Sequence, residues 1–188
     1  MKSLEEQMSI YAAYHQDARN KATHFIGVPL IMLAILVPLT WLRIDVAGFG
    51  ITAAMLLAAA VLAYYFVLDV PLALAMLVVI GLLIWLAEAI AARGTAQGWA
   101  WFGALFVGGW ILQLVGHVFE GRKPALADNL FQVFVAPIFL AAEVFFALGF
   151  KKELHEKVLQ LRRAQSAVSS ISLTRTSSRS GASGSRSR

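Results

Sequence analysis

The sequence predicts an all-α integral membrane protein, a transmembrane bundle of about five apolar helices. Two observations carry this prediction. The chain of 188 residues is 59% hydrophobic and only 14% charged, whereas a soluble domain has about 25% charged residues. Its apolar segments are also close to the roughly 20 residues that a helix needs to cross a hydrocarbon core. This composition excludes an ordinary soluble domain.

Each predicted helix corresponds to one apolar segment. In chain order the segments are 25–42, 46–68, 70–92, 98–118 and 130–150. Three of them contain no Asp, Glu, Lys or Arg, whereas 70–92 carries only Glu88 and 130–150 only Glu143. None alternates apolar and polar residues as the strands of a membrane β-barrel do. Four spans and one re-entrant segment remain an alternative.

The remaining segments are polar. Residues 1–24 suit an interfacial helix that precedes the transmembrane domain, 25–150. Residues 151–165 are charged and predict a short exposed helix, and the Ser- and Arg-rich tail 166–188 predicts disorder. The distribution of basic residues favours a cytoplasmic C-terminus. We expect a multi-pass protein of the bacterial inner membrane, or of the endoplasmic reticulum if it is eukaryotic.

Three of the four histidines are predicted to gather at one membrane face. Short turns connect the first four helices, which makes neighbours antiparallel. The fourth helix therefore ends, at His117, on the side where the first begins, at His24. His15 precedes His24 by nine residues, and at about 100° per residue the two would face opposite ways on one unbroken helix. If both bind one ion, the chain must bend between them.

Three imidazoles can hold an iron, zinc or copper ion with a position left open. The chain contains no cysteine, so thiolate sites are excluded. The alternative is that these histidines only form hydrogen bonds between helices or face headgroups. The same alternative applies to the polar stripe that Gln113 and Glu120 form with His117.

Several other polar residues are candidates for the site. Asn20 lies four residues before His24 and is placed to orient it. Glu143 lies inside an apolar segment, where a carboxylate is costly unless it is paired, so it is either a partner of a ligand or a structural acid. Arg122 and Lys123 are candidates to attract an anionic substrate, or they are interfacial anchors.

Two blocks of sequence resemble a known family. They are YHQDARNKATHFIGVP and GWILQLVGHVFEGRKPALADNLFQVFVAPIFLAAEV, and the resemblance covers about residues 8–150. They are similar to the membrane proteins related to the yeast 2-hydroxy fatty acid dioxygenase, long classed as a domain of unknown function. The resemblance implies an oxidoreductase that uses Fe²⁺ and dioxygen to shorten a 2-hydroxy fatty acid by one carbon, an α-oxidation.

The resemblance also implies the site residues. Matched to the family's motifs, His15, His24 and His117 are implied as iron ligands, and Asn20, Glu120 and Glu143 as supporting polar groups of the catalytic site. For substrate binding, Asn20, Gln113, Arg122 and Lys123 are the candidates. The expected partners are a fatty acyl substrate, dioxygen and the lipid bilayer, with no nucleic acid.

The residues alone are compatible with three other functions. A lipid-binding or scaffold protein would bind no stoichiometric metal. A small transporter would depend on Glu88 and Glu143 more than on the histidines. A zinc hydrolase would work without oxygen.

Overall fold

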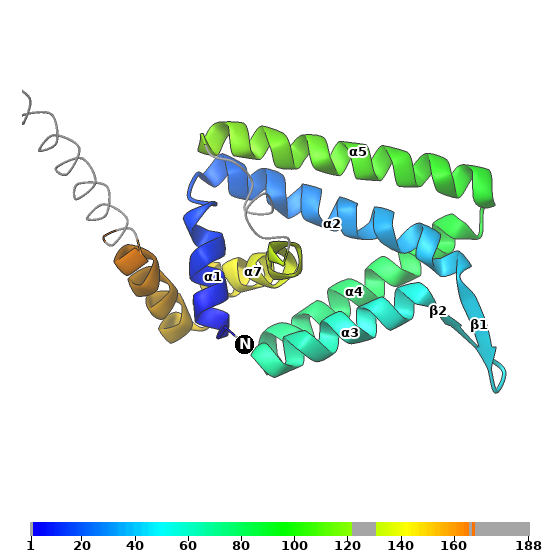
Figure 1. Cartoon of the computed structure of the whole chain (residues 1–188), viewed down its shortest axis with the longest axis horizontal. Coiled ribbons are helices and arrows are strands. Elements are labelled where there is room, and N and C mark those ends of the chain that lie inside the picture. Colours follow the sequence, from blue (N-terminus) through cyan, green and yellow to red (C-terminus); the bar gives the residue numbers. More distant parts are fainter. Residues whose placement is uncertain (1, 122–130, 166, 168–188) are drawn as a thin grey trace, which may run out of the picture.

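The computed structural model describes residues 2–121, 131–165 and 167, and within them the protein is almost entirely helical (Figure 1). The all-α prediction is confirmed. The described helices, in chain order, are α1 (Leu4–Ala13), α2 (Ala18–Trp41), α3 (Ala53–Leu68), α4 (Val70–Ala91), α5 (Thr95–Glu120), α7 (Gln132–Ala147) and a C-terminal helix, Lys152–Gln165.

Five of these helices are apolar, and they differ in length. α2, α4 and α5 are each long and apolar enough to cross a membrane. α3 and α7 have 16 residues each. α7 and the C-terminal helix pass the same test together as a pair bent by 118°, so the described chain has three candidate spans, or four if the bent pair is one span.

The prediction that 46–52 is helical is wrong. Strands β1 (Arg43–Val46) and β2 (Phe49–Thr52) form an antiparallel hairpin there. Its turn places Ala47 and Gly48 at positive φ, 51° and 85°, a conformation that glycine adopts without strain. Ile44, Val46 and Ile51 are β-branched, which favours strands. Helix α3 begins only after this hairpin, where the Thr52 side chain accepts a hydrogen bond from the Met55 N–H.

Helices α2 and α5 lie side by side and antiparallel along most of their length (Figure 1). Glycines on both helices make this approach possible. A Cβ atom at Gly109 would lie 3.0 Å from the carbonyl oxygen of Gly27, and one at Gly98 would lie 2.5 Å from the Trp41 ring. Small residues at a membrane helix interface let two backbones approach closely. The pairing brings the start of α2 to the end of α5.

Helix α1 closes this end of the bundle. Ser3 and Glu6 form a capping box that starts the helix. Its apolar side chains, including Leu4 and Met8, are buried in a cluster with residues of α7 such as Phe139. In the same region the Tyr64 hydroxyl of α3 donates a hydrogen bond to the Gln7 side chain. These contacts anchor α1 to α7 and α3.

Candidate metal centre

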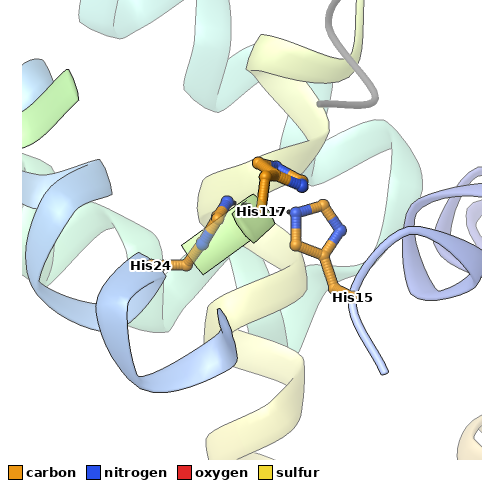
Figure 2. A group of neighbouring side chains, drawn as sticks. All are labelled: His15, His24 and His117. Carbon is orange, nitrogen blue, oxygen red and sulfur yellow. Dashed lines mark hydrogen bonds between the residues drawn. The ribbon is translucent and has the colours of Figure 1, made fainter. Parts of the chain in front are cut away.

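The chain bends sharply between His15 and His24, as a shared site requires. Helix α1 ends at Ala13, and α2 begins at Ala18 after the N-cap residue Asp17, whose carboxylate accepts a hydrogen bond from the Arg19 N–H. His15 lies in the linker between the two helices, and its ring points toward His24 instead of away from it (Figure 2). The bend overcomes the helical spacing that would otherwise separate the two rings.

The three histidines meet in one buried cluster (Figure 2). Their side chains are 2% (His15), 2% (His24) and 6% (His117) exposed, and one ligand atom from each lies within 4.8 Å of the others. The ring centroids are 4.5 to 5.1 Å apart. Among the residues that the structure describes, this is the group of His, Asp and Glu side chains able to hold a metal ion. The structure thus brings together the three predicted ligands.

Hydrogen bonds determine which ring nitrogen of His15 and of His24 is free to bind a metal ion. His15 Nδ1 lies 2.8 Å from the Tyr11 carbonyl oxygen, and His24 Nδ1 lies 2.9 Å from the Asn20 carbonyl oxygen. Since a carbonyl only accepts, each Nδ1 carries the proton and donates it. In a neutral imidazole the Nε2 atom is then a bare lone pair. The two Nε2 atoms face each other at 3.1 Å, an unfavourable contact between acceptors unless a cation lies beside both.

The donor set fits a metal ion. Two nitrogens that each lie about 2.1 Å from one ion are roughly 3.0 to 3.4 Å apart in octahedral or tetrahedral geometry, and the His15–His24 separation of 3.1 Å falls in that range. The third ring, His117, has a buried Nδ1 with no hydrogen-bond partner among the described residues. Burial, together with the neighbouring rings and Lys21, lowers the pKa of His15 to about 3. His15 is therefore neutral and able to ligate at neutral pH.

Tyr11 supports His15 and was not among the sequence-predicted residues. Its ring stacks on the His15 ring with centroids 3.9 Å apart and an angle of 5° between the planes. Its carbonyl oxygen accepts the hydrogen bond from His15 Nδ1. The i, i+4 spacing of Tyr11 and His15 at the end of α1 is the sequence signal that could have identified this pair.

Glu120 positions the linker and is not one of the three residues of the histidine cluster. Its carboxylate accepts hydrogen bonds from the backbone N–H groups of Gln16 at 3.0 Å and Asp17 at 2.9 Å, and from Asn20 Nδ2 at 3.0 Å. These N–H groups precede or begin α2, where a negative charge is favourable. Gly121, at φ 67°, ends α5 immediately after Glu120. Glu120 thus connects the end of α5 to the linker that carries His15.

Asn20 orients His24, but through its backbone. Among the described residues, the expected hydrogen bond from the Asn20 side chain to His24 is absent. Asn20 Nδ2 instead donates to Glu120 and to the Tyr14 carbonyl. The Asn20 carbonyl instead accepts from His24 Nδ1. An i to i−4 carbonyl of this kind is available to any residue, so the side chain of Asn20 serves the linker.

Glu143 lies apart from the histidine cluster. Its carboxylate forms an ion pair with Lys21 Nζ at 2.8 Å, which links α7 to α2. The pairing satisfies a carboxylate that would be costly in an apolar segment. Arg122 and Lys123, the candidates for attracting an anionic substrate, lie outside the described residues.

A cavity of about 120 Å³ opens beside the three rings, between α2, α5 and α7. Its walls are mostly apolar and include Val28, Trp110 and Pro137. Two buried amides also line it, Gln113 (7% exposed) and Gln132 (4% exposed). Gln113 Nε2 and Gln132 Oε1 have no hydrogen-bond partner among the described residues. Buried polar groups are normally paired, so both atoms are available to a ligand.

Gln132 was not among the site residues predicted from the sequence. Gln132 and Glu143 are the polar side chains of α7, and a polar residue within an apolar segment is the signal that could have identified it. Gln113, by contrast, is a sequence-predicted substrate-binding residue, and the structure places it at the cavity beside His117.

Replacing Glu120 by glutamine tests its role in placing His15. The neutral amide loses the charge-assisted bonds to the linker, so we expect metal affinity to fall by about 10- to 100-fold, the usual effect of disturbing a group that orients a ligand. Metal titration of the purified protein measures this. Glu88→Gln is the matched control, because Glu88 pairs with Arg43 at the far end of α4. If Glu120→Gln and Glu88→Gln bound the metal ion with equal affinity, the role of Glu120 in placing His15 would be contradicted.

Fold and site together define a class: a multi-pass membrane protein with a buried three-histidine centre at the meeting ends of two long helices. The family model described as "2-hydroxy-palmitic acid dioxygenase Mpo1-like" matches residues 1–148. The chain is also 35% identical over 153 residues to the 2-hydroxy-palmitic acid dioxygenase MPO1 of Saccharomyces cerevisiae, covering 80% of this chain and 84% of that protein. The chain therefore belongs to the Mpo1-like family, which confirms the resemblance. No solved structure matches it.

Proposed function

We propose that this protein is an Fe²⁺-dependent dioxygenase that shortens 2-hydroxy fatty acids by one carbon. One observation carries the proposal: two imidazole lone pairs and a third buried ring converge beside an apolar cavity. The name of the yeast relative supplies the substrate class and the use of dioxygen. The histidine cluster of this chain supports the use of dioxygen, and the apolar cavity beside it supports a fatty acyl substrate.

The proposed reaction balances without an external reductant. The 2-hydroxy acid and one dioxygen give the fatty acid shorter by one carbon, carbon dioxide and water. The bond between the carboxyl carbon and the hydroxyl-bearing carbon breaks, the latter carbon becomes the new carboxyl group, and dioxygen is reduced. Iron, when bound, supplies the redox chemistry that lets dioxygen react. Iron, zinc and copper all accept imidazole. The redox step excludes zinc, and the choice of iron over copper rests on the resemblance to the family.

The chain's own residues bind and orient the reactants. His15, His24 and His117 would hold the ion, with the first two rings kept in position by their Nδ1–H bonds to backbone carbonyls. Gln113 Nε2 is available to donate to a substrate carboxylate, and Gln132 Oε1 to accept from its 2-hydroxyl group. The apolar walls take the start of the acyl chain and exclude water from the reacting end.

An anaerobic assay tests the proposal. The protein, purified into lipid nanodiscs, is loaded with Fe²⁺ under nitrogen and given 2-hydroxypalmitic acid before air is admitted. We expect about one iron per chain, no product under nitrogen, and the shortened acid by mass spectrometry after oxygen enters. Parallel loading with zinc should give no product. Turnover with zinc or without oxygen would indicate a hydrolase, and failure to bind any metal would leave a lipid-binding or transport role.

A further inference from the structure

A second apolar cavity, of about 110 Å³, lies next to the one beside the histidines. Helices α2, α3, α4 and α7 form its walls, with Leu36, Ala58, Val61 and Ile80 among the lining residues. Four residues line both cavities: Met32, Ile35, Val133 and Pro137. The two spaces are therefore neighbours that share one wall.

The two cavities follow α2 inward from the metal centre. His24 and Val28 line the first cavity, Met32 and Ile35 line both, and Leu36 lines the second. At 1.5 Å per residue, the path from His24 to Leu36 is about 18 Å long. Apart from the Tyr65 hydroxyl, the polar side chains that line it lie at its beginning, with the histidines, Gln113 and Gln132.

The far cavity has no free polar group to bind a headgroup. Tyr65 lines it, but the Tyr65 hydroxyl donates a hydrogen bond to the Phe134 carbonyl at 2.7 Å. The other lining residues are apolar. The far cavity therefore suits a hydrocarbon chain whose polar end lies elsewhere, and the amides and imidazoles of the metal centre lie on the other side of the shared wall.

The volumes decide how much chain each space can hold. A dry cavity of roughly 150 Å³ holds one benzene molecule. The first cavity, about 120 Å³, accordingly holds only a short stretch of chain. The second cavity, beyond Met32 and Ile35, offers the further apolar space that a long acyl chain needs and a short chain does not.

We infer that the second cavity binds the distal part of the acyl chain, and that the α3 residues Ala58 and Val61 set the preference for long-chain substrates. The inference rests on the proposed function for the identity of the headgroup. Ala58 is buried and has the smallest side chain of the lining residues. A larger side chain at this position fills the space that a long chain needs and leaves the first cavity intact.

Ala58→Phe tests the inference, with Val61→Phe as a second variant. Ala60→Phe is the matched control, since Ala60 is on the same helix but exposed on its surface. Binding of 2-hydroxyoctanoic and 2-hydroxypalmitic acid is measured in nanodiscs, by competition with radiolabelled 2-hydroxypalmitic acid for the wild type and by direct titration for the variants. Each lost methylene contact weakens binding severalfold. We expect both cavity variants to bind the long acid at least about tenfold more weakly and the short acid unchanged.

The control should bind both acids as the wild type does. An equal loss for both acids, an unchanged long-chain affinity in the two cavity variants, or the same loss in Ala60→Phe would overturn the inference. Binding is read out without turnover. A protein that binds the acids with this chain-length dependence but does not oxidise them would therefore contradict the proposed function alone.

Discussion

Replacing His15, His24 or His117 singly by alanine is expected to abolish iron binding and turnover. Each side chain contributes one of three nitrogens that lie within 4.8 Å of one another, and no Asp or Glu among the described residues completes the group. Changes in groups that merely orient a ligand cost about 10- to 100-fold in affinity, so loss of a ligand itself should exceed 100-fold. Elemental analysis of the purified variants and the oxygen-dependent assay measure both effects.

His155→Ala is the control for the three histidine variants. His155 is exposed, and its ring stacks on Phe146 with centroids 4.4 Å apart, far along the chain from the cluster. We expect this variant to retain iron and activity. The ligand assignment would be refuted by wild-type iron content in any of the three cluster variants, or by loss of iron in His155→Ala alone.

Gly116→Val is expected to destabilise the protein and disrupt the centre at the same time. A Cβ atom at Gly116 would lie 2.2 Å from Thr23 Oγ1, 2.5 Å from Asn20 Oδ1 and 3.3 Å from His24 Nδ1. Either α2 and α5 separate or these side chains move, and His117, the next residue, moves with the helix. Overpacking of this kind costs about 1 to 3 kcal/mol, and metal affinity should fall with it.

Thermal unfolding and iron titration measure the Gly116 effects. Gly108→Val is the matched control on the same helix, since a Cβ atom at Gly108 would meet nothing within 4 Å. A Gly116→Val protein with wild-type unfolding temperature and iron affinity would show that α2 and α5 do not need this close approach.

The apolar helices of the described fold agree with the sequence prediction, except at 46–52. The apolar segments behind α2, α4 and α5 were predicted from length and composition, because burial in lipid depends on the residues of each segment alone. Because consecutive helices alternate in direction, the sequence also predicted His24 and His117 at the same end. The helices that carry them, α2 and α5, lie antiparallel as expected. At 46–52 the apolar composition outweighed the β-branched residues and Gly48, so the hairpin was missed.

The sequence by itself determined an all-α membrane protein of this family and the three histidines that gather at one end. Only the tertiary structure decided how they meet. The bend at Asp17, the Glu120 bonds to the linker, the Lys21–Glu143 pair and the place of Gln132 in the cavity depend on contacts between separate segments. Glu120 and Asp17 are 103 residues apart in the chain. No local pattern specifies such a contact, because it exists only after the helices have packed.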